Sequence, residues 1–83
     1  MVGDRPRFDG LMVDAHRAML ALDNVTFGGA SRATAAAVRD GLRVYSQLVD
    51  YRQTERMSAA ESSQLQNALD LIRSRLRFFG EAV

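Results

Sequence analysis

The chain has 83 residues, of which 47% are hydrophobic and 25% charged, with a net charge of +1. This length allows a single domain, residues 1–83, and the apolar content excludes an intrinsically disordered chain. No cysteine is present, which excludes disulfides and thiolate metal sites, and no apolar run reaches the ~20 residues of a membrane span. The first residues form no secretory signal, so we expect a cytoplasmic protein without membrane contact.

Apolar residues in the first third of the chain recur at steps of three and four, as along one face of a helix. They are Phe8, Leu11, Met12, Ala15, Met19 and Leu22. The pattern predicts a helix over about residues 6–23, followed by a loop over residues 23–30. Val13 and Leu20 fall nearly opposite the main face, so we predict that they form an exposed apolar patch.

A second helix is predicted over residues 31–54, with Ser31 as its N-cap. Its apolar seam has heptad spacing and consists of Ala35, Val38, Leu42, Tyr45 and Val49, with Val44 and Leu48 to one side. Gly41 interrupts this helix without a turn signal around it, at a cost of about 1 kcal/mol relative to alanine. We therefore expect a neighbouring helix to approach closely at Gly41.

The third predicted helix spans residues 58–80 and has the clearest boundaries. Ser58 and Glu61 have the spacing of a capping box, and Gly80 stands where a glycine ends a helix. The seam consists of Leu65, Leu69, Ile72, Leu76 and Phe79, and Leu71 and Phe78 are expected to widen its apolar arc. The link before this helix is short, which predicts that it runs antiparallel to the second helix.

Together these elements predict an all-α fold. The helices over residues 31–54 and 58–80 form a long antiparallel hairpin, and the helix over residues 6–23 fills the groove between them. The expected architecture is therefore a three-helix bundle.

The sequence offers few groups for catalysis, and we predict that the protein is not an enzyme and has no cofactor or metal. His16 is the single histidine, and it shares a helical stripe with Asp9 and Asp23 at seven-residue spacing. Each step along that stripe is about 10 Å, too long for a carboxylate to orient the imidazole or share a metal ion with it. We therefore expect His16 to be a solvated surface residue.

Nucleic-acid binding is the alternative function. The segment Gly29-Ala30-Ser31-Arg32-Ala33-Thr34 resembles the turn and recognition-helix start of LacI-type helix-turn-helix repressors, over about ten residues. This resemblance implies a small DNA-binding regulator that uses residues 29–39, with DNA contacts from Ser31, Arg32, Thr34 and Arg39. The region before Gly29 departs from the family, because Val25-Thr26-Phe27-Gly28 replaces a short alanine-containing helix.

A second basic feature is the arginine-rich end of the third predicted helix. Arg73 and Arg77 share a face, whereas Arg75 points toward the apolar arc. The three arginines therefore do not form one stripe that could follow a phosphate backbone.

The leading functional hypothesis is a non-enzymatic module for protein–protein interaction or oligomerisation. A chain of this size buries only about 60% of its unfolded surface, so association with a partner or a second copy would add stability. We expect a homodimer, since a two-fold axis buries the same patch twice. The candidate interface residues are Val13, Leu20, Phe27 and Tyr51.

Overall fold

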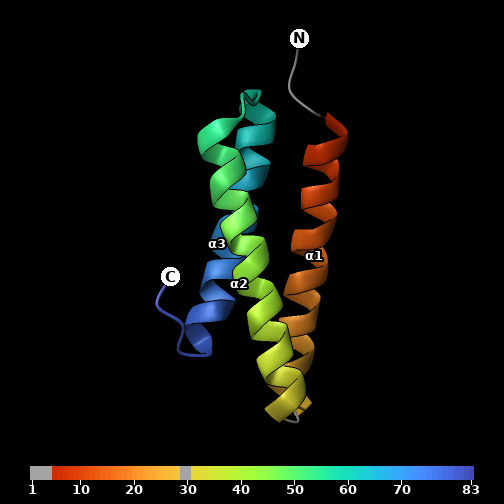
Figure 1. Ribbon diagram of the computed structural model, residues 1–83, viewed down its shortest axis with the longest axis vertical. Coiled ribbons are helices and arrows are strands. Elements are labelled where there is room, and N and C mark those ends of the chain that lie inside the picture. The colour runs from red at the N-terminus through yellow and green to blue at the C-terminus, as the bar shows by residue number, and fades with distance from the viewer. Residues whose placement is uncertain (1–4, 29–30) are drawn as a thin grey trace.

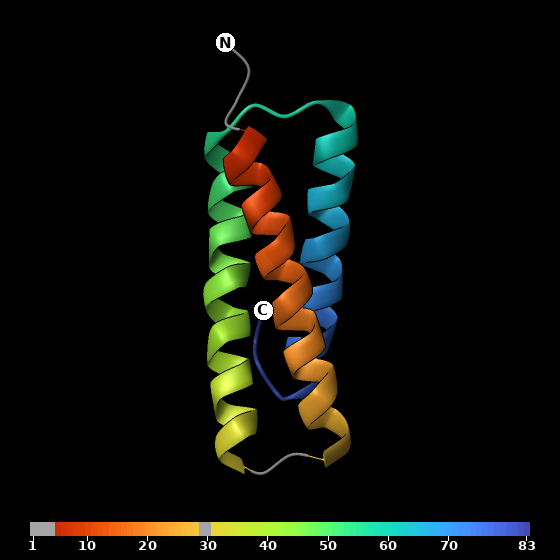
Figure 2. The same ribbon diagram turned by 90° about the vertical axis from the view of Figure 1, so that its right-hand side faces the viewer.

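The computed structural model describes the backbone of residues 5–28 and 31–83, and the side chains of residues 7–25 and 32–83. It contains three helices: α1 (Arg5–Gly28), α2 (Ser31–Thr54) and α3 (Ala59–Phe78). Helix α2 runs antiparallel to both of its neighbours, and all three helices pack side by side (Figures 1 and 2). The fold is therefore the predicted all-α three-helix bundle, with dimensions of 46 × 22 × 16 Å.

Helix α1 is longer than the sequence predicts. It continues to Gly28, through most of the segment predicted as a loop over residues 23–30. Two side chains in this extension are held by the bundle, because Val25 packs against the core and Asp23 binds Arg75 of α3. The helix-propensity penalty of a β-branched residue is only a few tenths of a kcal/mol, so such tertiary contacts outweigh it.

The core is formed by one face from each helix. Its large, fully buried side chains are Tyr51, Phe8, Leu22, Leu48, Leu65, Leu69, Ile72, Leu76 and Val44. Most of the apolar face predicted for α1 and most of the seam predicted for α3 are in this core or packed against it. The periodicity of these two helices thus identified the surfaces that they bury.

The seam predicted for α2 was correct only in part. The buried residues of this helix are Ala37, Gly41, Val44, Leu48 and Tyr51, of which Val44 and Leu48 were predicted to lie to one side of the seam. Of the predicted seam itself, Ala35 is exposed, and the other members are half-buried and pack against the core. The physical reason lies at Gly41, where an added Cβ would be 3.2 Å from both Leu22 Cδ1 and Leu76 Cδ2. The glycine lets α1 and α3 approach α2 on that side, so the most deeply buried line passes through it.

Both ends of α3 have the local structure that the sequence predicts. The Ser58 hydroxyl accepts a hydrogen bond from the Glu61 backbone N–H at 3.2 Å, and the Glu61 carboxylate accepts one from the Ser58 backbone N–H at 3.0 Å. At the other end, Gly80 has a φ of 89°. The N–H of Glu81 donates to the Leu76 carbonyl and that of Gly80 to the Arg77 carbonyl, which is a Schellman motif.

The capping box predicts a measurable stability effect. Replacing Ser58 with alanine removes the acceptor of the Glu61 N–H, so the free energy of unfolding should fall by about 1 kcal/mol. Urea denaturation monitored by circular dichroism measures this change. Ser63→Ala is the matched control, because Ser63 is exposed within the same helix and alanine favours the helix there. A loss at Ser63 as large as that at Ser58 would contradict the capping argument.

Candidate interaction surface

Four large apolar side chains remain exposed among those that the structure describes. Val13 and Leu20 are each 49% exposed on α1, as the sequence predicts. Leu71 is 45% exposed and Phe78 is 71% exposed on α3, so the prediction that these two widen the buried arc of their helix was wrong. The reason is that the buried stripe of α3 passes through Ala68 and Ile72, and Leu71 and Phe78 lie to one side of it, away from the core.

A shallow groove lies between α1 and α3, and Leu71 is one of the residues that line it. It has a volume of about 340 Å³, and it is lined by Met12, Ala15, His16, Met19, Gln64, Asn67, Ala68 and Leu71. Val13 and Leu20 are three and four residues from His16, which places both just outside the α1 wall of the groove. Phe78 follows Leu71 by seven residues and continues the same stripe of α3. We call this surface, formed by Val13, Leu20, Leu71, Phe78 and the groove, the α1–α3 face.

An ion pair ties α1 to α3 at one end of the groove. Arg75 donates from Nε to Oδ1 of Asp23 at 2.7 Å and from Nη2 to Oδ2 at 3.3 Å. Arg75 was predicted to point toward the apolar arc of α3, and the structure shows its partly buried guanidinium bound to the α1 carboxylate. Both side chains are partly exposed, so the pair contributes about 1 kcal/mol or less to stability. Its two parallel hydrogen bonds mainly hold α1 and α3 in register along the α1–α3 face.

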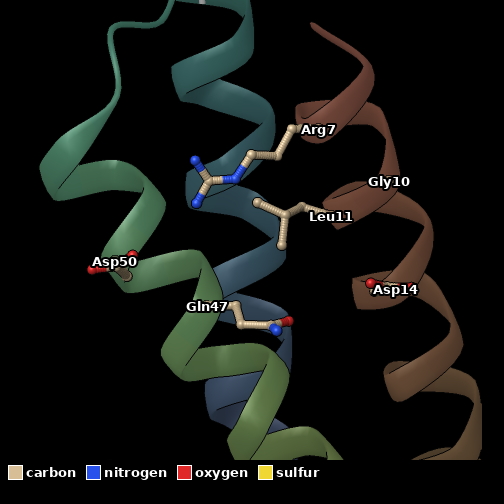
Figure 3. Close-up of a pocket in the computed structure, with 6 residues that line it drawn as sticks. All are labelled: Arg7, Gly10, Leu11, Asp14, Gln47 and Asp50. Atoms are coloured by element: carbon tan, nitrogen blue, oxygen red, sulfur yellow. The ribbon is translucent and has the colours of Figure 1, made fainter. Parts of the chain in front are cut away.

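A polar hollow of about 290 Å³ lies between α1 and α2. Its lining residues are Arg7, Gly10, Leu11, Asp14, Gln47 and Asp50 (Figure 3). The guanidinium of Arg7 lies 5.1 Å from the centre of the Tyr51 ring, and its Nη1 is 3.6 Å from Glu55. No group of three potential metal ligands occurs within the described part of the chain. The charge of Arg7 at this hollow is thus engaged with α2 within the bundle.

One predicted interface residue, Tyr51, does not join the α1–α3 face. The Tyr51 side chain is only 2% exposed, and its ring packs 5.9 Å from that of Phe8 in the core. Tyr51 is therefore not available for contact with a partner, and its choice as an interface residue is corrected. The side chain of Phe27 lies outside the described residues.

The residues proposed to contact DNA lie at the start of α2. Arg32 and Arg39 are exposed, and Thr34 and Arg39 line an open groove of about 680 Å³ beside Phe79 and Glu81. The side chain of Ser31, including its predicted N-cap role, lies outside the described residues. Helices α1 and α2 run side by side and antiparallel (Figure 1), whereas the two helices of a helix-turn-helix cross at roughly 90–120°.

Two arginines away from the start of α2 bind groups of their own chain. Arg77 donates from Nε to the carbonyl of Val83 at 2.8 Å. Arg43 donates to Asp40 at 2.6 Å, and this hydrogen bond, together with the carboxylate charge, raises the pKa of Arg43. Its carboxylate partner stands three residues earlier on the same exposed helix face, a local surface pair.

The chain matches no protein-family model, and no curated protein or solved structure is significantly similar to it. None of the three described helices is long and apolar enough to cross a lipid bilayer. The fold therefore places the protein among small antiparallel three-helix bundles. The features that bear on its function are those of the protein's own surface.

Proposed function

We propose that this protein is a non-enzymatic module that self-associates as a two-fold dimer through the α1–α3 face. The observation that carries the proposal is the position of the large exposed apolar side chains. Leu71 lines the groove, Val13 and Leu20 lie one turn from its His16, and Phe78 continues the stripe of Leu71, so the four side chains follow one side of the bundle. Burial of such a patch against its own copy removes apolar surface from water in both chains at once.

The size of the face is suitable for such a contact. Helix α3 has 20 residues and is about 30 Å long, and two adjacent packed helices are about 20 Å wide together. The face therefore has a projected area of about 600 Å², and its corrugated accessible surface approaches the ~800 Å² per partner of a specific interface.

The overall charge also favours a second copy as the partner. The net charge is +1, so two copies repel each other only weakly. Arg75, at one end of the groove, is already paired with Asp23 within the same chain. A partner of strong opposite charge is therefore not required to cover this surface.

Sedimentation velocity at micromolar concentration tests the proposal. The wild type should sediment as a dimer, and a Val13→Glu/Leu20→Glu variant should sediment as a monomer, because two carboxylates would be buried without partners. The control is Ser46→Glu/Gln53→Glu, which changes the charge equally at two exposed positions of α2 with the same seven-residue spacing, and which should remain dimeric.

Two results would count against this function. A monomeric wild type would refute self-association, and a dimer that survives both glutamates on α1 would place the interface elsewhere. Binding to random-sequence DNA that weakens steeply between low and moderate salt would instead support the nucleic-acid alternative.

A further inference from the structure

The α1–α3 face has one titratable side chain at its centre. His16 lines the groove between Met12 and Met19, and Val13 and Leu20 lie on its outer side. In the isolated bundle the His16 side chain is exposed, so water can solvate either of its protonation states. A second copy that covers both Val13 and Leu20 and the groove also covers His16, because His16 lies at the edge of the groove nearest to these two residues.

We infer that His16 makes the dimer sensitive to pH, with assembly favoured when the imidazole is neutral and disfavoured when it is protonated. This inference rests on the proposed function. Removing a charged side chain from water costs free energy, whereas a neutral imidazole can be buried with a single hydrogen-bond donor and acceptor to satisfy. The dimer therefore binds fewer protons than two separate monomers, and acidification shifts the equilibrium toward monomers.

The neighbouring groups offer little compensation for a charge at this position. On α3, the residues that line the groove opposite His16 are neutral: Gln64, Asn67, Ala68 and Leu71. The carboxylate of Glu61, one turn before Gln64, accepts a hydrogen bond from the backbone of Ser58. Helix α2 packs against the other side of α1, where its Asp50 lines the hollow beside Asp14 and its Arg43 carries a charge close enough to interact with Asp14.

On α1 itself, the charged groups of the same side stand at a distance. Asp9 and Asp23 are each seven residues from His16, about 10 Å along the helix, and Asp23 is bound to Arg75. Arg17 is adjacent in sequence and is itself a cation, so it is not a counter-ion for a protonated imidazole. None of the residues that line the groove with His16 carries a carboxylate.

The test compares the dimer dissociation constant of the full chain at pH 8.0 and pH 5.5 by sedimentation equilibrium. Each buried histidine weakens assembly by about tenfold at pH 5.5, so a dimer that buries two of them should dissociate up to about 100-fold more readily than at pH 8. His16→Gln and His16→Ala variants should dimerise at both pH values with the same dissociation constant. Circular dichroism at each pH checks that the monomer stays folded.

Each outcome decides the matter. A wild-type dimer that is equally stable at both pH values would overturn the inference and leave the proposed dimer intact. A response to pH that persists in both neutral variants would assign the proton to another group, such as the terminal amine, and would also overturn it. Variants that fail to dimerise at pH 8 would show that the dimer requires the imidazole itself as a contact. This result would overturn the inference that its protonation controls assembly. A wild-type monomer at both pH values would overturn the dimer and the inference together.

Discussion

The Ile72→Ala variant should lose about 2–5 kcal/mol of its free energy of unfolding. Ile72 is 0% exposed, and it belongs to the buried core cluster to which all three helices contribute. Truncation to alanine removes buried methyl groups and leaves a cavity that surrounding helices fill only in part. For a domain of this size, whose total stability is of the order of 5–10 kcal/mol, such a loss is a large fraction of the whole.

Leu71→Ala is the matched control, because Leu71 is the preceding residue on the same helix and is 45% exposed. Its cost should be well under 1 kcal/mol in the monomer, since alanine is at least as good a helix former. Urea denaturation at a protein concentration low enough to give monomers measures both effects. If Leu71→Ala were as damaging as Ile72→Ala, the orientation of α3 in the bundle would be wrong.

The second large effect is expected at Gly41. A Cβ at this position would already lie 3.2 Å from side-chain atoms of Leu22 and Leu76, and a leucine would add three more carbons in the same space. Gly41→Leu should therefore destabilise the bundle by about 3 kcal/mol, in spite of a gain in helix propensity of somewhat less than 1 kcal/mol. Gly41→Ala should change stability much less, because the leucine tips can give way by a few tenths of an ångström.

Gly10 provides the control for this prediction. It also lies within a helix, but a Cβ built there meets no atom within 4 Å. Gly10→Ala should therefore raise the free energy of unfolding by about 1 kcal/mol. Thermal or urea denaturation of the two alanine variants and Gly41→Leu tests the contrast. Equal gains at Gly10 and Gly41 would show that α1 and α3 do not approach α2 at Gly41 as the structure indicates.

The sequence by itself determined the fold class and the local signals at helix ends. Three stretches with periodic apolar residues and a short link are sufficient to predict an antiparallel helical bundle. Ser58, Glu61 and Gly80 act through the backbone groups of their own helix, so their roles depend on spacing alone and were confirmed. The exposure of Val13 and Leu20 was likewise predicted from the sequence, because both fall far from the centre of a clear apolar stripe.

The tertiary structure decided the features that depend on two or more helices at once. The continuation of α1 beyond residue 23 is supported by contacts of Asp23 and Val25 with the rest of the bundle, which a local propensity pattern does not contain. The buried line of α2 is set by the approach of two helices at Gly41, and apolar residues on both sides of that line made it ambiguous in the sequence.

For the α1–α3 face, too, the sequence supplied one part of the information and the tertiary structure the other. Leu71 and Phe78 repeat the seven-residue spacing of Val13 and Leu20, and that shared spacing was the available signal in the sequence. Whether such a stripe is buried or exposed depends on how far α3 is rotated about its axis in the bundle. The rotation is set by packing of all three helices, as where Leu22 and Leu76 meet at Gly41, and the Asp23–Arg75 pair holds α1 and α3 at the resulting register. Only the packed structure could therefore bring the two stripes together with His16 in a single face.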